Sequence, residues 1–123
     1  MSMSIHRILA LATFAIAGAA CAPAFAHAKL QSSDPQAGST LDTAPQQVRL
    51  KFSEALEPAF SRIRVTGPGN REVPVAAAAV DKADPTVMTA PLPKLSAGEY
   101  RIQWTAMARD GHKVKGEVAF KVK

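Results

Sequence analysis

Four stretches of this chain alternate apolar and polar residues one by one. They span residues 48–52, 62–65, 100–106 and 117–123, for example Val48, Leu50 and Phe52 around Arg49 and Lys51. An alternation of period two is the pattern of β-strands that bury one face. No stretch after residue 26 has the spacing of an amphipathic helix, and 123 residues leave room for one domain. We therefore predict an all-β fold.

Turn-forming residues separate these stretches. The turn signals are Asp34-Pro35 with Gly38, the run 67–70, Asp84-Pro85, Pro91, Pro93, Gly98 and Asp110-Gly111. Several short strands at this spacing predict a small Ig-like Greek-key β-sandwich or barrel. The alanine run 76–79 lies between two prolines and is interpreted as a poorly defined strand or a connection.

The first 26 residues have the three-part layout of a signal peptide. Residues 1–7 carry a positive charge, residues 8–22 are almost entirely apolar, and Ala24-Phe25-Ala26 offers a peptidase site. The alternative is an uncleaved anchor, but 15 apolar residues are short for a bilayer, which needs about 20. We expect cleavage after Ala26, export to the periplasm, and a mature domain of residues 27–123.

Cys21 raises a second alternative, a lipoprotein cut before that cysteine. Residues 18–20 lack the leucine-like residue that such signals carry. Ordinary cleavage removes Cys21, so the mature chain has no cysteine for a disulfide or a thiolate metal site.

The basic residues are spread along the chain. The net charge is +5, or +4 once Arg7 is removed with the leader. A nucleic-acid groove needs a concentrated patch with stacking aromatic residues, and the sequence has neither. The mature chain also has no second apolar run long enough for a membrane, so we expect a soluble protein, and a monomer.

Only two histidines remain after cleavage, and one of them, His27, is the new N-terminus. A free α-amine has a pKa near 8, and together with Nδ1 of the same histidine it can close a six-membered chelate ring on one metal. Asp110 and His112, two residues apart across Gly111, would complete three nitrogens and one oxygen. Such a set suits Cu(II), whereas four-coordinate zinc usually prefers a tetrahedron.

Each of these residues also has a structural interpretation. His27 could be a frayed terminus, Asp110-Gly111 alone is more simply a hairpin turn, and Glu54 could be a solvated carboxylate at the end of a strand. Three further residues are interpreted as core residues rather than ligands or redox groups, namely Met88, Met107 and Trp104. Cleavage at His27 combined with the Asp110 and His112 pair favours the metal site.

Four segments of the mature sequence stand out together: residues 27–35 (HAKLQSSDP), 50–54 (LKFSE), 98–104 (GEYRIQW) and 110–112 (DGH). With these segments in this order, the mature sequence resembles the CopC family of periplasmic copper-resistance proteins. The resemblance implies a Greek-key β-barrel or sandwich and a Cu(II) site at His27, Asp110 and His112. It also implies that Glu54 lies close to the copper, as a further oxygen ligand or, as we expect, in the outer shell.

The chain departs from the family at one point. Some members carry a methionine-rich loop with a histidine that binds Cu(I), but here residues 66–88 hold one methionine and no histidine. Because Cu(I) prefers thioether ligands, we predict one Cu(II) ion per chain and no Cu(I) site.

The leading functional hypothesis is a non-catalytic Cu(II) carrier in copper resistance or homeostasis. The resemblance suggests an inner-membrane copper transporter of the CopD type as a partner. One alternative is a copper-dependent oxygenase with an N-terminal histidine, which would consume oxygen when reduced. Another is a metal-free Ig-like interaction module, whose spectrum and melting temperature would not respond to Cu(II).

Overall fold

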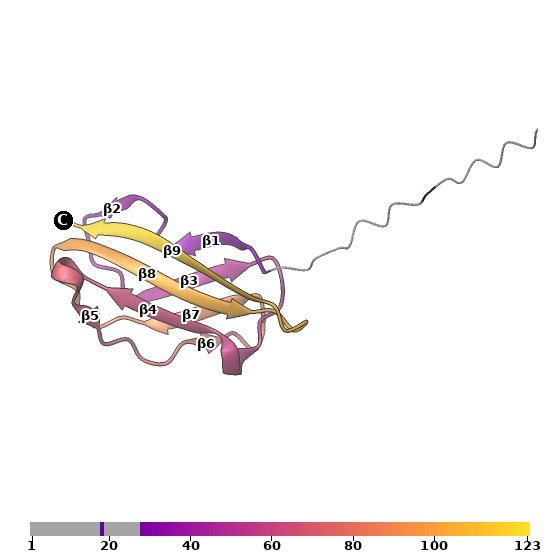
Figure 1. Ribbon diagram of the computed structural model, residues 1–123. Helices are drawn as coiled ribbons and strands as arrows, with labels where there is room; N and C mark the ends of the chain where they lie inside the picture. The colour runs from indigo at the N-terminus through magenta and orange to yellow at the C-terminus, as the bar shows by residue number, and fades with distance from the viewer. Residues whose placement is uncertain (1–17, 19–27) are drawn as a thin grey trace, which may run out of the picture.

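Two β-sheets form the two layers of the computed structural model, which describes residue 18 and residues 28–123 (Figure 1). The first sheet has the order β1-β3-β7-β6, with β1 Leu30–Asp34, β3 Gln47–Phe52, β7 Val87–Pro91 and β6 Ala79–Val80. The second has the order β2-β9-β8-β4-β5, with β2 Ser39–Leu41, β9 Lys113–Val122, β8 Gly98–Met107, β4 Arg62–Thr66 and β5 Glu72–Val73. Two single turns of 3-10 helix, η1 Pro58–Phe60 and η2 Pro68–Asn70, precede β4 and β5. The predicted all-β sandwich is confirmed.

Strand pairing is antiparallel except at one edge. β2 runs parallel to β9, with Ser39 opposite Phe120 and Leu41 opposite Val122. The longest pairing joins β8 to β9 over ten residue pairs, from Gly98 opposite Val122 to Met107 opposite Lys113. This long hairpin fixes the position of the turn that carries Asp110 and His112.

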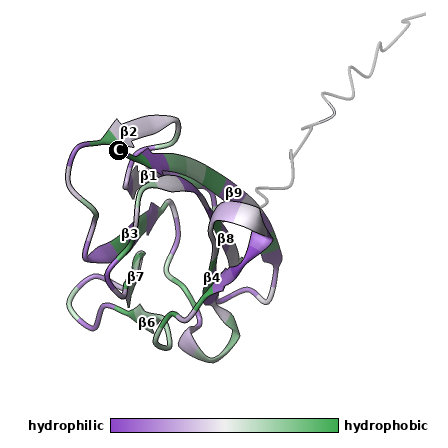
Figure 2. Cartoon of the chain, turned by 90° about the vertical axis from the view of Figure 1, so that its left-hand side faces the viewer, coloured by the Kyte–Doolittle hydropathy of each residue, from purple (hydrophilic) through white to green (hydrophobic). Residues whose placement is uncertain are grey.

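The apolar positions of the alternating strands fill the space between the sheets. Viewed along the sandwich, the sheets form separate layers (Figure 2), and the buried residues include Val48, Leu50, Phe52, Ile102, Ala106, Val118 and Phe120. The Trp104 ring meets Phe52 of the other sheet edge-on at 4.9 Å, and Tyr100 stacks on Phe120 at 5.3 Å. Trp104 is therefore the core anchor that the sequence predicted.

The methionine predictions have different outcomes. Met88 is fully buried opposite Leu50, as a core residue should be. Met107 is only half-buried, and it lies between the inward-facing Ala106 and Ala108. Because neighbouring strand residues point to opposite faces, Met107 belongs to the outer face of the second sheet.

The two ends of the sandwich are distinct. The start of β1, the end of β3, η1 and the β8–β9 turn lie at one end, while the C-terminus lies at the other (Figure 1). We call the first of these the hairpin end. It contains all the described residues that the sequence predicted as metal ligands.

Candidate metal centre

Ala28 and Lys29 attach the start of the described chain to the hairpin end. The side chain of Ala28 is 2% exposed and belongs to the hydrophobic core. The Lys29 backbone N–H donates to Ser53 Oγ at 2.9 Å, and the Ser53 N–H donates to the Lys29 carbonyl at 2.8 Å. The residues just before β1 are therefore held against the end of β3.

The segment after β3 is joined in turn to the β8–β9 hairpin. Leu56 and Ala108 form an antiparallel bridge, and both side chains are almost fully buried. The Glu57 N–H donates to the Met107 carbonyl at 2.8 Å. Residues 53–57 thus connect the beginning of the domain to the turn that carries Asp110 and His112.

The turn before β7 also holds this segment. The Phe52 N–H donates to the Thr86 carbonyl and the Leu56 N–H donates to the Pro85 carbonyl, at 2.8 and 2.9 Å. Hydrogen bonds from the Thr86 hydroxyl and backbone N–H to Asp84 lower the pKa of the Asp84 carboxyl below its ordinary value of 3.8. The ionised carboxylate thereby fixes the turn on which residues 52–56 rest.

Asp110 and His112 are in direct contact. Asp110 Oδ2 lies 2.9 Å from His112 Nδ1, and Asp110 Oδ1 accepts the His112 backbone N–H at 3.0 Å. The turn is closed by the Ala108 N–H on the His112 carbonyl and by Gly111, whose φ of 90° favours a residue without a side chain. The two side chains, which the sequence separates by one glycine, are thus held together within the turn.

This contact has a chemical consequence for metal binding. A carboxylate that holds one ring nitrogen of a histidine orients the ring and directs the other nitrogen toward a metal. With Nδ1 against Asp110, a metal at His112 would bind through Nε2. Asp110 could supply an oxygen through its remaining lone pairs or act by orienting the ring.

Glu54 lies at the same end but does not join this pair. It follows Ser53 in a bend after β3 and is half-buried. Among residues 28–123, no three His, Cys, Asp or Glu side chains are grouped as a metal site. In this part of the chain the ligand candidates are therefore the Asp110 and His112 pair, with Glu54 nearby. His27 lies outside the described residues.

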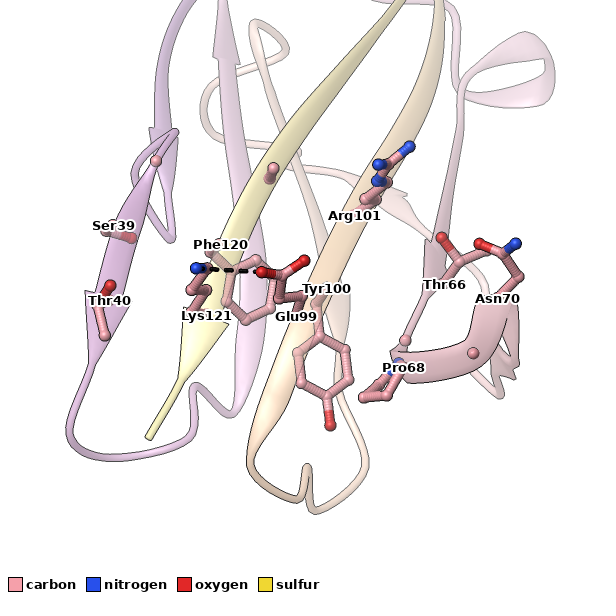
Figure 3. Close-up of a pocket in the computed structure, with 14 residues that line it drawn as sticks. Ser39, Thr40, Thr66, Pro68, Asn70, Glu99, Tyr100, Arg101, Phe120 and Lys121 are labelled. Atoms are coloured by element: carbon pink, nitrogen blue, oxygen red, sulfur yellow. Dashed lines mark ion pairs between the residues drawn. The ribbon is translucent and has the colours of Figure 1, made fainter.

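The opposite end of the sandwich has a groove that the sequence did not predict. Its volume is about 410 Å³, and it lies among the ends of β2 and β9, the start of β8 and η2 (Figure 3). Its wall includes the ion pair between Glu99 and Lys121, at 3.0 Å, and the hydroxyls of Ser39, Thr40 and Thr66. None of the residues that line it is a methionine, cysteine or histidine, so the groove offers no soft ligand for a metal.

Within the described part of the chain, no helix is both long enough and apolar enough to cross a membrane.

Residues 30–123 match the family model of the CopC domain. The chain belongs to the CopC family. Copper resistance protein C of Pseudomonas syringae pv. tomato is 38% identical over 127 aligned residues, which cover 98% of this chain and 100% of that protein.

This CopC-family chain is also similar to a solved structure and to a segment of a longer protein. The crystal structure of PcoC, a methionine-rich copper resistance protein from Escherichia coli, matches with a TM-score of 0.72 and 38% identity, over 80% of this chain and 100% of that one. Copper transport protein CutJ of Bacillus subtilis strain 168 is 35% identical over 99 residues, which make up 80% of this chain but 18% of that protein. The family and the sandwich fold predicted from the sequence are thus confirmed.

Proposed function

We propose that the mature chain binds one Cu(II) ion at the hairpin end and acts as a non-catalytic copper carrier in the periplasm. The ligands would be the α-amine and imidazole of His27, an oxygen of Asp110 and the imidazole of His112, with Glu54 in the outer shell. The proposal includes signal-peptide cleavage after Ala26, since only cleavage at that bond makes the His27 amine a free ligand.

One observation carries the proposal: the start of the domain and the β8–β9 turn are both attached to the hairpin end of the sandwich. Lys29 and Ser53 hold the start of the domain, and Leu56 and Ala108 hold the hairpin beside it. Ala28 is buried at this end, which supports the proposal that the preceding residue supplies its ligands there. The Asp110 and His112 contact supports the same site, since it prepares an oriented imidazole.

The donor set favours Cu(II) over Cu(I). Imidazole, amine and carboxylate ligands suit the divalent ion, and thioethers suit the monovalent one. Met88 is sealed in the core, Met107 is on the outer face of the other sheet, and the groove at the far end has no thioether. These positions support a single Cu(II) site without a second site for Cu(I). The relative PcoC, in contrast, is described as methionine-rich.

The names of the relatives support a role in copper handling rather than oxygen chemistry, since they are copper resistance and copper transport proteins. In CutJ the matching segment is a small part of a much longer transport protein. We infer that this chain likewise delivers its ion to a membrane partner. We propose an inner-membrane transporter of the CopD type as that partner, and a monomeric carrier.

The test combines intact mass with copper titration of the exported protein. The mass should correspond to residues 27–123, and the titration should end at one Cu(II) per chain with the EPR spectrum of nitrogen and oxygen ligands. A different N-terminus that still bound copper as tightly would disprove the His27 chelate. A stoichiometry of two would disprove the single site, and reduced protein that consumed oxygen would favour the oxygenase instead.

A further inference from the structure

One exposed aromatic residue lies beside the hairpin end, on the outer face of the second sheet. Phe60, the last residue of η1, is 51% exposed and is the one large apolar side chain of the described residues with such exposure. Lys113 Nζ lies 5.7 Å from the centre of its ring. Lys113 is in turn paired with the half-buried Met107 at the last step of the β8–β9 ladder.

The next row of the same face is basic. Arg62 is opposite Thr105 on β8, and Thr105 is opposite Lys115 on β9. Neighbouring strands are about 4.8 Å apart, so the two exposed cations flank Thr105 on either side. We call Phe60, Arg62, Thr105, Met107, Lys113 and Lys115 the basic-aromatic patch.

The charges of this patch are not balanced, in contrast to those of the other half of the face. Farther from the hairpin end, three cations of the face have partners, in the pairs Arg64–Glu72, Arg101–Glu117 and Lys121–Glu99. Among the described residues, no carboxylate forms an ion pair with Arg62, Lys113 or Lys115. The acidic residues next to the patch along the chain are Glu57, Asp110 and Glu117. Asp110 contacts His112, and Glu117 forms an ion pair with Arg101.

A shallow groove of about 610 Å³ crosses the face next to these cations. Its floor is the row Ile63, Trp104 and Gly116, where Trp104 points into the core against Phe52. Arg62 and Lys115 form one wall, and Arg64, Gln103 and Glu117 form the other. An extended peptide segment could lie along this groove with its acidic side chains on Arg62 and Lys115.

We propose that the basic-aromatic patch is a docking surface for an acidic segment of a partner protein. Carboxylates would pair with Arg62, Lys113 and Lys115, and an apolar side chain would cover Phe60 and Met107. Exposed aromatic and arginine side chains are typical anchors of protein interfaces, and complementary charge raises the rate of encounter. A partner docked here would lie next to Asp110 and His112.

The test uses the metal-free mature protein, so that its outcome does not depend on copper binding. The probe is a synthetic peptide of about twelve residues, with glutamates on both sides of a central leucine pair, and a second peptide has glutamine in place of each glutamate. Amide chemical shifts of the ¹⁵N-labelled protein are followed by NMR. The glutamate peptide should shift the amides of the patch and bind at least about fivefold more tightly than the glutamine peptide.

Variants separate the patch from general charge attraction. Arg62→Glu with Lys115→Glu should weaken peptide binding about tenfold or more, and Phe60→Ala should weaken it about threefold or more. The matched control is Lys82→Glu with Lys94→Glu, which makes the same change in net charge at two exposed loop positions and should change binding less than twofold. Unshifted amide spectra away from each substitution confirm that the variants fold.

Three results would overturn the proposal. The peptide could bind without shifting the patch, the control pair could weaken binding as much as the patch pair, or both peptides could fail to bind. A fourth outcome, tight binding to vesicles of phosphatidylglycerol and phosphatidylcholine with no binding of the glutamate peptide, would assign the patch to a membrane surface instead.

Discussion

The close approach of Trp104 to Gly116 predicts that Gly116→Ala destabilises the domain. The two residues are paired on β8 and β9, so their side chains point to the same face. A Cβ on residue 116 would lie 2.2 Å from Trp104 Cζ2 and 2.6 Å from Cε2. Ordinary contacts begin at 3.4 Å, so the indole ring would have to move by about 1 Å.

The ring has little room for that movement. Trp104 is 8% exposed and meets the edge of the Phe52 ring at 4.9 Å. Overpacking of this kind costs about 1–3 kcal/mol. For a domain of this size, each kcal/mol lowers Tm by about 4–8 °C, so Gly116→Ala should melt at least about 4 °C below the natural protein.

The assay is urea and thermal unfolding of the metal-free mature protein, followed by circular dichroism. Trp104→Phe provides the matched background, because phenylalanine lacks the outer ring that the new Cβ would meet. In that background Gly116→Ala should cost less, with a coupling free energy of about 1 kcal/mol or more. An equal cost in both backgrounds, or a cost below about 0.5 kcal/mol in the natural one, would refute the steric argument.

Three further predictions concern the metal site and its support. His112→Ala should weaken Cu(II) binding more than about 100-fold in a competition titration, because loss of a group that only orients a ligand already costs 10–100-fold; a smaller loss would contradict ligation by His112. One extra residue before His27 should weaken binding to a similar degree, since the amine that we propose as a ligand becomes an amide, and undiminished affinity would exclude the amine as a ligand. Asp84→Asn should lower Tm at neutral pH, where the carboxylate accepts the Thr86 hydrogen bonds. Because folding lowers this pKa, the stabilisation is present above the ordinary pKa and is lost as pH falls through the folded value. The Tm difference should therefore shrink as the pH is lowered below 3.8; a Tm difference that stays constant would contradict this.

The sequence predicted the strands whose two faces differ most. β3, β4, β8 and β9 bury one face against the core and leave the other in water, so their alternation is clear. β1 was not predicted, because its five residues are half-buried or exposed and mostly polar, as expected of an edge strand. The alanine run joins a strand only at Ala79, in β6.

β7 was also missed, for a different reason. It lies inside the first sheet between β3 and β6, and Val87 and Met88 are both buried, so its residues do not alternate. Pro91 was interpreted as a turn residue but is the last residue of the strand, opposite Gln47. Proline has no backbone N–H to donate to a neighbouring strand. It is compatible with the sheet here because no residue after Pro91 has to continue the pairing.

For the candidate site, spacing along the chain predicted what is local. It placed Asp110 and His112 together in a turn, and the structure shows them in contact. It could not predict that the Asp110 carboxylate would hold Nδ1, because this depends on the turn conformation. The link from Ser53 to Lys29 spans 24 residues and depends on how the strands pair, which periodicity does not reveal.

The direction of β9 decides how this protein can be attached to other molecules in the laboratory. β9 leaves the hairpin at Lys113 and reaches Val122 at the opposite end, about 30 Å away at the rise of an antiparallel strand. An affinity tag, fluorophore or surface linker joined after Lys123 would therefore leave the hairpin end open to solvent. The same addition at the front of the domain would be placed beside Ala28, at the end that carries Asp110 and His112.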